Sequence, residues 1–235
     1  MKNQNHRNLP ILFRVTLLAI LLPALHTLCA QNSVSSPNLA ERRAESYGGG
    51  VTGPGDLTGP LDRCPDGCHF IRFNHWWVSL PSLPGKQSSH IVIGDISTCI
   101  SKLSKDKTTV FTECMLSIGR VLKSGENIAS GSIVTVTREG GSVSVDSKKM
   151  SEGIEGQRLP SAHKEYAFFL VYRPMTDDYK ILTFYELTDH GITAADEPRY
   201  FHAHDGKSLD TFLGDVNSSI QDETPYLRPH DGGAK

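Results

Sequence analysis

The sequence predicts a mainly β protein, a small closed or nearly closed antiparallel barrel with one amphipathic helix near the carboxyl end. Three observations support this fold class. The 235 residues include 21 Gly and 13 Pro, a content typical of turn-rich chains rather than helical bundles. From residue 64 onward, runs of β-branched and aromatic residues alternate with turn residues, which indicates about seven strands. One segment, Ser208 to Ile220, has the apolar period of a helix.

The first thirty residues have the composition of a secretory signal peptide. Lys2, Arg7 and Arg14 are followed by an apolar run from Val15 to Leu28, and no acidic residue occurs before Glu41. The run is shorter than the ~20 residues that span a bilayer. We therefore expect residues 1–30 to direct export and to be removed.

Cleavage is expected after Ala30. A lipidated Cys29 is the alternative, although Leu28 before it is bulkier than lipoprotein signals prefer. No later stretch is apolar enough to cross a membrane, so we expect a secreted or periplasmic protein without a transmembrane span after signal removal.

Composition divides the remaining chain into three parts. Residues 31–63 are rich in Gly, Pro and Ser and offer few side chains for burial, which predicts a linker; an ordered arm lying on the domain is the alternative. Residues 64–222 carry the strand pattern and form the expected barrel-like domain. Residues 223–235 are expected to be a flexible tail.

The first two strands of the domain are predicted to form a hairpin. His90 to Leu103 is rich in Ile and Val, Ser104 to Lys107 reads as a turn, and Thr108 to Leu122 reads as the returning strand. Alternation along the second strand places one apolar set on the core face. This set comprises Cys114, Leu116 and Ile118.

Two shorter strands are expected next. Ser132 to Thr137 and Ser142 to Val145 are predicted to pair across a turn at Glu139-Gly140-Gly141, and residues 152–160 are expected to be a loop. A continuous apolar run from Lys164 to Tyr172 then predicts a strand buried on both faces.

The last two predicted strands are Tyr179 to Leu187 and a short one near Ile192, and a helix is predicted over Ser208 to Ile220. Ser208 or Asp210 can cap this helix, and apolar residues at helical spacing form one stripe. The stripe should pack on the barrel and cover an open end. It comprises Leu209, Phe212, Leu213, Val216 and Ile220.

Several strand motifs carry a resemblance to known domains. They are His90-Ile-Val-Ile-Gly-Asp-Ile, Phe111-Thr-Glu-Cys, Ile118-Gly-Arg-Val-Leu-Lys123, Tyr166-Ala-Phe-Phe-Leu and the Leu209 helix after Asp205-Gly206. Together they resemble a group of uncharacterised secreted bacterial proteins and, distantly, netrin-like domains, over roughly residues 88–221. The resemblance implies an OB-type barrel. Netrin-like metalloproteinase inhibitors act through an amino-terminal cysteine, which the long linker replaces here, so no functional residue is transferred.

Cysteines outside the leader indicate disulfide bonds, because an exported chain with an even number of them usually pairs them. Cys64 and Cys68 could form a local bridge. Cys99 and Cys114 lie opposite each other if the hairpin turns tightly around residues 106–107, whereas a slip of one residue leaves Cys114 a buried thiol. The spacing of Cys64, Cys68 and His69 fits neither haem attachment nor a zinc finger, and no cofactor is predicted.

Three aromatic residues are the candidate binding residues. Phe73, Trp76 and Trp77 could stack on a sugar or insert into a protein partner, or they could anchor the start of the domain on the barrel. Neighbouring side chains of an extended chain point to opposite faces, so at least one of the two tryptophans should be partly exposed.

Two histidines are the candidate metal ligands. On a strand, His202 and His204 would point to the same face, as a metal pair requires, but no third ligand is assigned. The alternative is a pair of exposed histidines that leads into the Asp205-Gly206 turn.

The charge balance and the missing motifs narrow the function. With 24 basic and 26 acidic residues, the chain lacks the excess of positive charge of a nucleic-acid binder. It contains no Gly-x-Ser-x-Gly, phosphate-loop or His-Glu-x-x-His motif. We expect a non-enzymatic exported binding or interaction module, with a protein or carbohydrate partner held by exposed aromatics. The alternative is a metal-dependent enzyme that uses His202 and His204.

Overall fold

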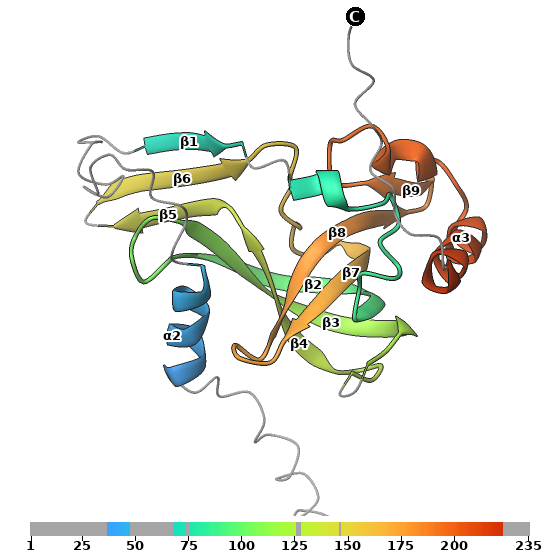
Figure 1. The fold of residues 1–235 in the computed structure, drawn as a ribbon, viewed down its shortest axis with the longest axis horizontal. Coiled ribbons are helices and arrows are strands. Elements are labelled where there is room, and N and C mark those ends of the chain that lie inside the picture. The colour runs from blue at the N-terminus through green and yellow to red at the C-terminus, as the bar shows by residue number, and fades with distance from the viewer. Residues whose placement is uncertain (1–36, 48–67, 74–75, 126–127, 146, 223–235) are drawn as a thin grey trace, which may run out of the picture. The chain divides into compact units, whose positions relative to one another are not determined.

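Five strands close into a barrel in the computed structural model, and the predicted mainly β fold is confirmed. Figure 1 shows these strands crossing at the centre of the domain. The strand order is β4-β3-β2-β7-β8, every pair in this series is antiparallel, and a parallel contact between β4 and β8 closes the ring. The five strands are β2 (His90–Leu103), β3 (Val110–Lys123), β4 (Ile133–Glu139), β7 (Glu165–Arg173) and β8 (Asp178–Thr188).

The structure describes residues 37–47, 68–73, 76–125, 128–145 and 147–222. The predictions for the leader, the tail and most of the linker lie outside these residues. Leu39–Lys235 make up one compact unit, which contains all the barrel strands. Within the described ranges, no helix combines the length and the apolar character needed to cross a bilayer.

The hairpin of β2 and β3 has the predicted register. Cys99 lies directly opposite Cys114, and their sulfur atoms are 1.97 Å apart, so the two residues form a disulfide. The core face of β3 is also confirmed, since Cys114, Leu116 and Ile118 are each at most 1% exposed.

A second sheet, of three strands, replaces the predicted hairpin after β4. β4 pairs with β3 and β8, whereas β5 pairs with β6, so the predicted pairing of these two segments is wrong. The physical reason lies at Gly140 and Gly141, whose φ angles of +95° and +137° turn the chain out of the barrel. The sheet has the order β1-β6-β5 and consists of β1 (Cys68–Arg72), β5 (Gly141–Val145) and β6 (Lys148–Ile154), the last beginning before the predicted loop and running into it.

β7 separates two apolar cores, which explains its continuous run of apolar residues. Tyr166, Phe168 and Leu170 point into the barrel, while Ala167 and Phe169 point outward into a second core. All five are at most 2% exposed, so the predicted burial on both faces is confirmed.

Helix α3 (Leu209–Gln221) covers the outer core. Ser208 caps the helix by accepting a hydrogen bond from the Thr211 amide, and Phe212 and Val216 are fully buried. They pack against outward-facing side chains of β2, β7 and β8 and of β9 (Gly191–Ala194). The helix is therefore packed on the barrel as predicted, but on its outer wall rather than over an open end.

The linker prediction is wrong for residues 39–47. Helix α2 (Pro37–Ser46) occupies most of this segment, and Arg43 and Tyr47 are only 4% and 7% exposed. The ordered arm, the alternative above, is the correct interpretation for these residues. One guanidinium and one aromatic ring provide the burial that the composition of the segment does not indicate.

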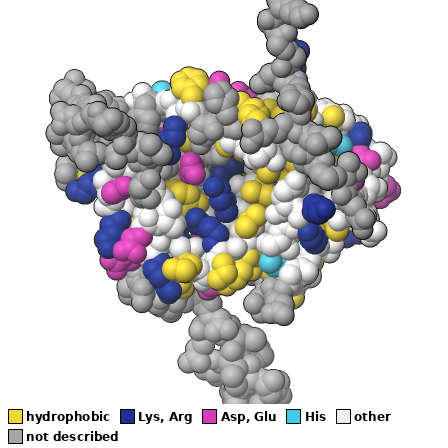
Figure 2. Space-filling view, viewed as in Figure 1, with side chains coloured by type: hydrophobic (Ala, Val, Ile, Leu, Met, Phe, Trp, Pro, Cys, Tyr) yellow, Lys and Arg dark blue, Asp and Glu magenta, His cyan; other side chains and the backbone are white. Residues whose placement is uncertain are grey.

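The surface carries mixed charge. On the face in Figure 2, Lys and Arg side chains lie beside Asp and Glu side chains, and hydrophobic side chains form several separate groups. In Figure 1, the three-stranded sheet and α3 lie on opposite sides of the barrel strands.

Candidate functional site

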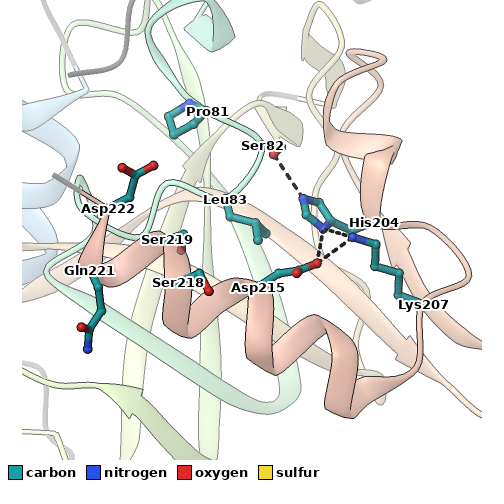
Figure 3. A pocket seen from close by; sticks show the side chains of 10 residues that line it. All are labelled: Pro81, Ser82, Leu83, His204, Lys207, Asp215, Ser218, Ser219, Gln221 and Asp222. Atoms are coloured by element: carbon teal, nitrogen blue, oxygen red, sulfur yellow. Dashed lines mark hydrogen bonds and ion pairs between the residues drawn. The ribbon is translucent and has the colours of Figure 1, made fainter. Parts of the chain in front are cut away.

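A pocket of about 690 Å³ lies between α3 and the segment that leads from the short helix η2 (Trp76–Ser79) to β2 (Figure 3). The short helix η3 (Phe201–His204) contributes a third wall. This volume is within the range of small-molecule sites. The lining residues are mostly polar: Pro81, Ser82, Leu83, His204, Lys207, Asp215, Ser218, Ser219, Gln221 and Asp222.

Local packing positions the polar side chains of the pocket. Burial of Phe212 and Val216 sets the rotation of α3, and Asp215, between them on the helix, faces the pocket (Figure 3). The hydroxyl of Tyr185 on β8 donates to the backbone oxygen of Ser82 at 2.5 Å, which fixes the segment opposite. The pocket is therefore built on elements that the outer core holds in place.

Four side chains form one connected polar group in the pocket. Ser82 Oγ lies 3.2 Å from His204 Nε2, and His204 Nδ1 lies 3.2 Å from Asp215 Oδ2. The Lys207 ammonium donates to the same Asp215 oxygen at 2.6 Å and lies 3.3 Å from His204 Nδ1. We assign the imidazole proton to Nδ1, facing the carboxylate, so that Nε2 accepts from the Ser82 hydroxyl.

The charges of this group at neutral pH follow from its surroundings. Burial lowers the pKa of His204, and the neighbouring Lys207 lowers it further. The hydrogen bond from Lys207 lowers the pKa of Asp215. The imidazole is therefore neutral at pH 7, the carboxylate is ionised, and the ammonium pairs with it.

The order of serine, imidazole and carboxylate is that of serine hydrolases, but Lys207 changes its chemistry. In a hydrolase the imidazole takes the serine proton and becomes a cation that the carboxylate stabilises. Here an ammonium lies 3.3 Å from the imidazole and uses the same carboxylate oxygen, so the imidazolium is disfavoured. The arrangement suits hydrogen bonding to a bound molecule better than proton abstraction from Ser82.

The predicted tryptophans support the barrel rather than line the pocket. They lie in η2 rather than in an extended chain, so the premise of the expectation is wrong, but both are partly exposed, as expected for at least one of them. Their buried parts pack against the outer core. The Trp76 ring stacks on Phe201 with 5.9 Å between centroids, and its Nε1 donates to the Glu155 backbone oxygen at 3.0 Å. These contacts favour the anchoring role.

Phe73 remains an exposed aromatic candidate. Its side chain is 67% exposed, beside the 52% exposed Ile71 of β1. It does not line the pocket, and the structure does not bring it together with the residues there. Binding through Phe73 stays a prediction.

The two histidines do not share a face. They lie in η3 rather than on a strand, so the basis for a metal pair is wrong. His202 Nδ1 lies 2.7 Å from Asp205 Oδ2, whereas the imidazole of His204 enters the pocket. Among the residues that the structure describes, no group of three or more His, Cys, Asp or Glu side chains could hold a metal ion.

Of the predicted disulfides, Cys99 with Cys114 is present, and the pairing of Cys64 with Cys68 lies outside the residues whose side chains are described. Sequence reasoning missed Ser82, Lys207 and Asp215. Asp215 and Lys207 each lie near a residue that the sequence did point to, Phe212 and His204. No short motif joins Ser82 to them, because the fold alone brings it close.

No protein-family model matches the chain, and no curated protein is significantly similar to it. The pocket therefore has to be interpreted from its own geometry.

Proposed function

We propose that this chain is an exported, non-enzymatic binding module built on an OB-type barrel, and that the pocket beside α3 binds a small polyhydroxylated ligand of the carbohydrate class. The single observation that carries the ligand class is the mixture of hydrogen-bonding groups in the pocket. Hydroxyls, an amide, a neutral imidazole and a carboxylate paired with an ammonium can together serve sugar hydroxyls, which both donate and accept.

The strand order supports the OB-type assignment. Numbered along the chain, the barrel strands follow the order first, second, third, fifth, fourth, and the third and fifth run parallel. This is a five-stranded Greek-key arrangement, and OB-type barrels serve as binding scaffolds. The leader-like residues 1–30 and the disulfide of Cys99 with Cys114 support export to an oxidising compartment.

Binding can be tested by nuclear magnetic resonance with the ¹⁵N-labelled full chain and neutral trisaccharides such as maltotriose and cellotriose. We expect amide shifts around His204 and Asp215. Gln221→Ala and Ser218→Ala, which change two lining residues outside the Ser82–His204 chain, should each weaken binding by about tenfold, or 1.4 kcal/mol.

Two controls separate this proposal from the alternatives. Phe73→Ala should leave the affinity unchanged; a loss there would assign the ligand to the exposed aromatic instead. A fluorophosphonate probe should not label Ser82, and labelling abolished by His204→Ala would identify a hydrolase. If none of the trisaccharides shifts the amide signals, the proposed ligand class is contradicted.

A further inference from the structure

The amino-terminal arm, residues 39–47, packs on the outer face of the barrel. The surface that it covers, called the groove below, is formed by β3 and β4 between the loop of residues 104–109 and the loop of residues 174–177. In OB-type barrels, ligands bind on the second and third strands and the loops after the first and fourth. These are the equivalent elements here, so the chain places its own arm at the position of an OB ligand.

Tyr47 is the first anchor of the arm. Its ring stacks on Phe111 of β3 with 4.5 Å between centroids, and the guanidinium of Arg173 lies 4.7 Å from the ring. The phenol donates to Thr137 Oγ1 of β4 at 2.9 Å, and Thr137 donates in turn to the buried carboxylate of Asp178. The groove therefore provides an aromatic floor, a cation and a polar end for one tyrosine.

Arg43 is the second anchor. Its Nε and Nη2 donate to the backbone oxygens of Thr176 and Asp177 at 3.0 and 2.9 Å. The guanidinium also lies 3.9 Å from Glu113 and 3.9 Å from Asp178, whose side chains are 11% and 0% exposed. Two carbonyls and two carboxylates form a receptor for a planar cation with several donors.

The arm contacts the barrel as a bound peptide would, through a few buried side chains. Within residues 39–47, only Arg43 and Tyr47 are buried, and they are four residues apart, on one side of a helical turn. The strand ladder of the barrel closes without the arm.

We propose that this groove is a peptide-binding site for a short helical segment that carries arginine and tyrosine four residues apart, and that residues 39–47 occupy it as a tethered ligand. A partner protein with the same pair on a helix of its own would bind by displacing the arm. This inference goes beyond the pocket beside α3 and does not depend on it.

The test uses a fluorescent synthetic peptide with the sequence of residues 37–47 and two forms of the full chain, the wild type and Arg43→Ala/Tyr47→Ala. The variant, with its own arm weakened, should bind the peptide at least about tenfold more tightly than the wild type, whose groove is occupied. Peptides with Ala in place of either anchor should lose about tenfold or more in affinity. Gln221→Ala in the α3 pocket should not change peptide binding, so the two proposals fail independently.

A second measurement covers the case in which the double variant does not fold. In the wild type, excess peptide should speed hydrogen exchange of the amides of residues 39–47 and leave those of β3 and β7 unchanged. A folded double variant that does not bind the peptide would overturn the proposal. The proposal would also be overturned if the amides of residues 39–47 exchanged only when the whole domain unfolds, at a rate that excess peptide does not change.

Discussion

Two arginines in the described part of the chain are almost wholly buried, and they are held in different ways. Arg138, on β4, donates from both terminal nitrogens to the carboxylate of Asp196 at 2.9 and 2.7 Å, and the two side chains are 1% and 0% exposed. Arg43, in the arm, donates to backbone carbonyls, and its nearest carboxylates are 3.9 Å away.

The difference distinguishes a cation that is part of the barrel from one that is docked on it. A bidentate ion pair in a low-dielectric interior is strong, but it leaves a costly unpaired charge when one partner is removed. The rings of Trp76 and Phe184 lie 5.0 and 5.2 Å from the Arg138 guanidinium and keep water away. Water can replace the contacts of Arg43 when the arm leaves the barrel. Replacing Arg43 should therefore expose the surface beneath the arm and leave the core of the barrel intact.

Arg138→Met should have the largest effect. It leaves Asp196 buried with only neutral donors, Thr183 Oγ1 at 2.8 Å and the Arg158 amide at 3.0 Å. We expect the free energy of unfolding in urea to fall by about 3–5 kcal/mol. The double variant Arg138→Met/Asp196→Asn, which removes both charges, should recover part of this loss. A fall of the same size in both variants would mean that packing, and not the unpaired charge, determines the cost.

Neither arginine stands out in the sequence, whereas α3 does. The apolar residues of α3 recur with the period of a helix, and this period is recognisable in the sequence without knowledge of the tertiary contacts. The same holds for the alternation of β3 and for the opposed Cys99 and Cys114. Arg43 and Arg138 are single polar residues whose partners lie far along the chain, at Thr176 and Asp196, so only the fold reveals them.

The wall that carries the Arg43 groove is itself cross-linked, and breaking that link should have the next largest effect. Cys99 and Cys114 enclose a loop with a sequence separation of 15. Removing both as Cys99→Ala/Cys114→Ala should lower the free energy of unfolding by about 3 kcal/mol, because the unfolded chain gains freedom. Dithiothreitol should destabilise the wild type and leave the variant unchanged. Equal stability of the oxidised and reduced wild type would contradict the expectation.

Arg43→Ala should cost less, about 1–2 kcal/mol, because the carbonyls that it leaves behind can be solvated. The matched control is Arg158→Ala, since Arg158 is 64% exposed and pairs with the 56% exposed Glu197. That change should fall within about 0.5 kcal/mol of zero. Urea unfolding gives both values. If Arg43→Ala costs as much as Arg138→Met, the arm is integral to the barrel and the comparison between the two arginines fails.

The pocket beside α3 shows a similar limit of prediction from sequence. The sequence points to His204 only through the neighbouring His202, but the two imidazoles make different hydrogen bonds, that of His202 with Asp205 and that of His204 with Asp215. The partners of His204 come from three separate segments: Ser82 before β2, Lys207 before α3 and Asp215 within it. A pairing of this kind leaves no spacing rule in the sequence, because each contact depends on how the outer core orients its element.

The smallest expected effect is a change in the pH dependence of stability that comes from His204. The ammonium of Lys207 lies beside this imidazole and donates to its carboxylate partner, Asp215. The pKa of His204 in the folded state is below the usual 6.5, from burial first and then from Lys207, while Asp215 and Asp205 act in the opposite direction. The unfolded chain then binds more protons, so stability should be full above pH 6.5 and decrease as the pH falls from 6.5 through the folded pKa. Asp215, whose pKa is lowered, acts in a separate pH range, because its contribution to stability is lost only below its usual pKa of 3.8.

Urea unfolding between about pH 5 and pH 8 measures the change of stability with pH that His204 causes. His204→Gln should flatten it, whereas stability that rises on acidification would show that the carboxylates, not Lys207 and burial, dominate at this imidazole.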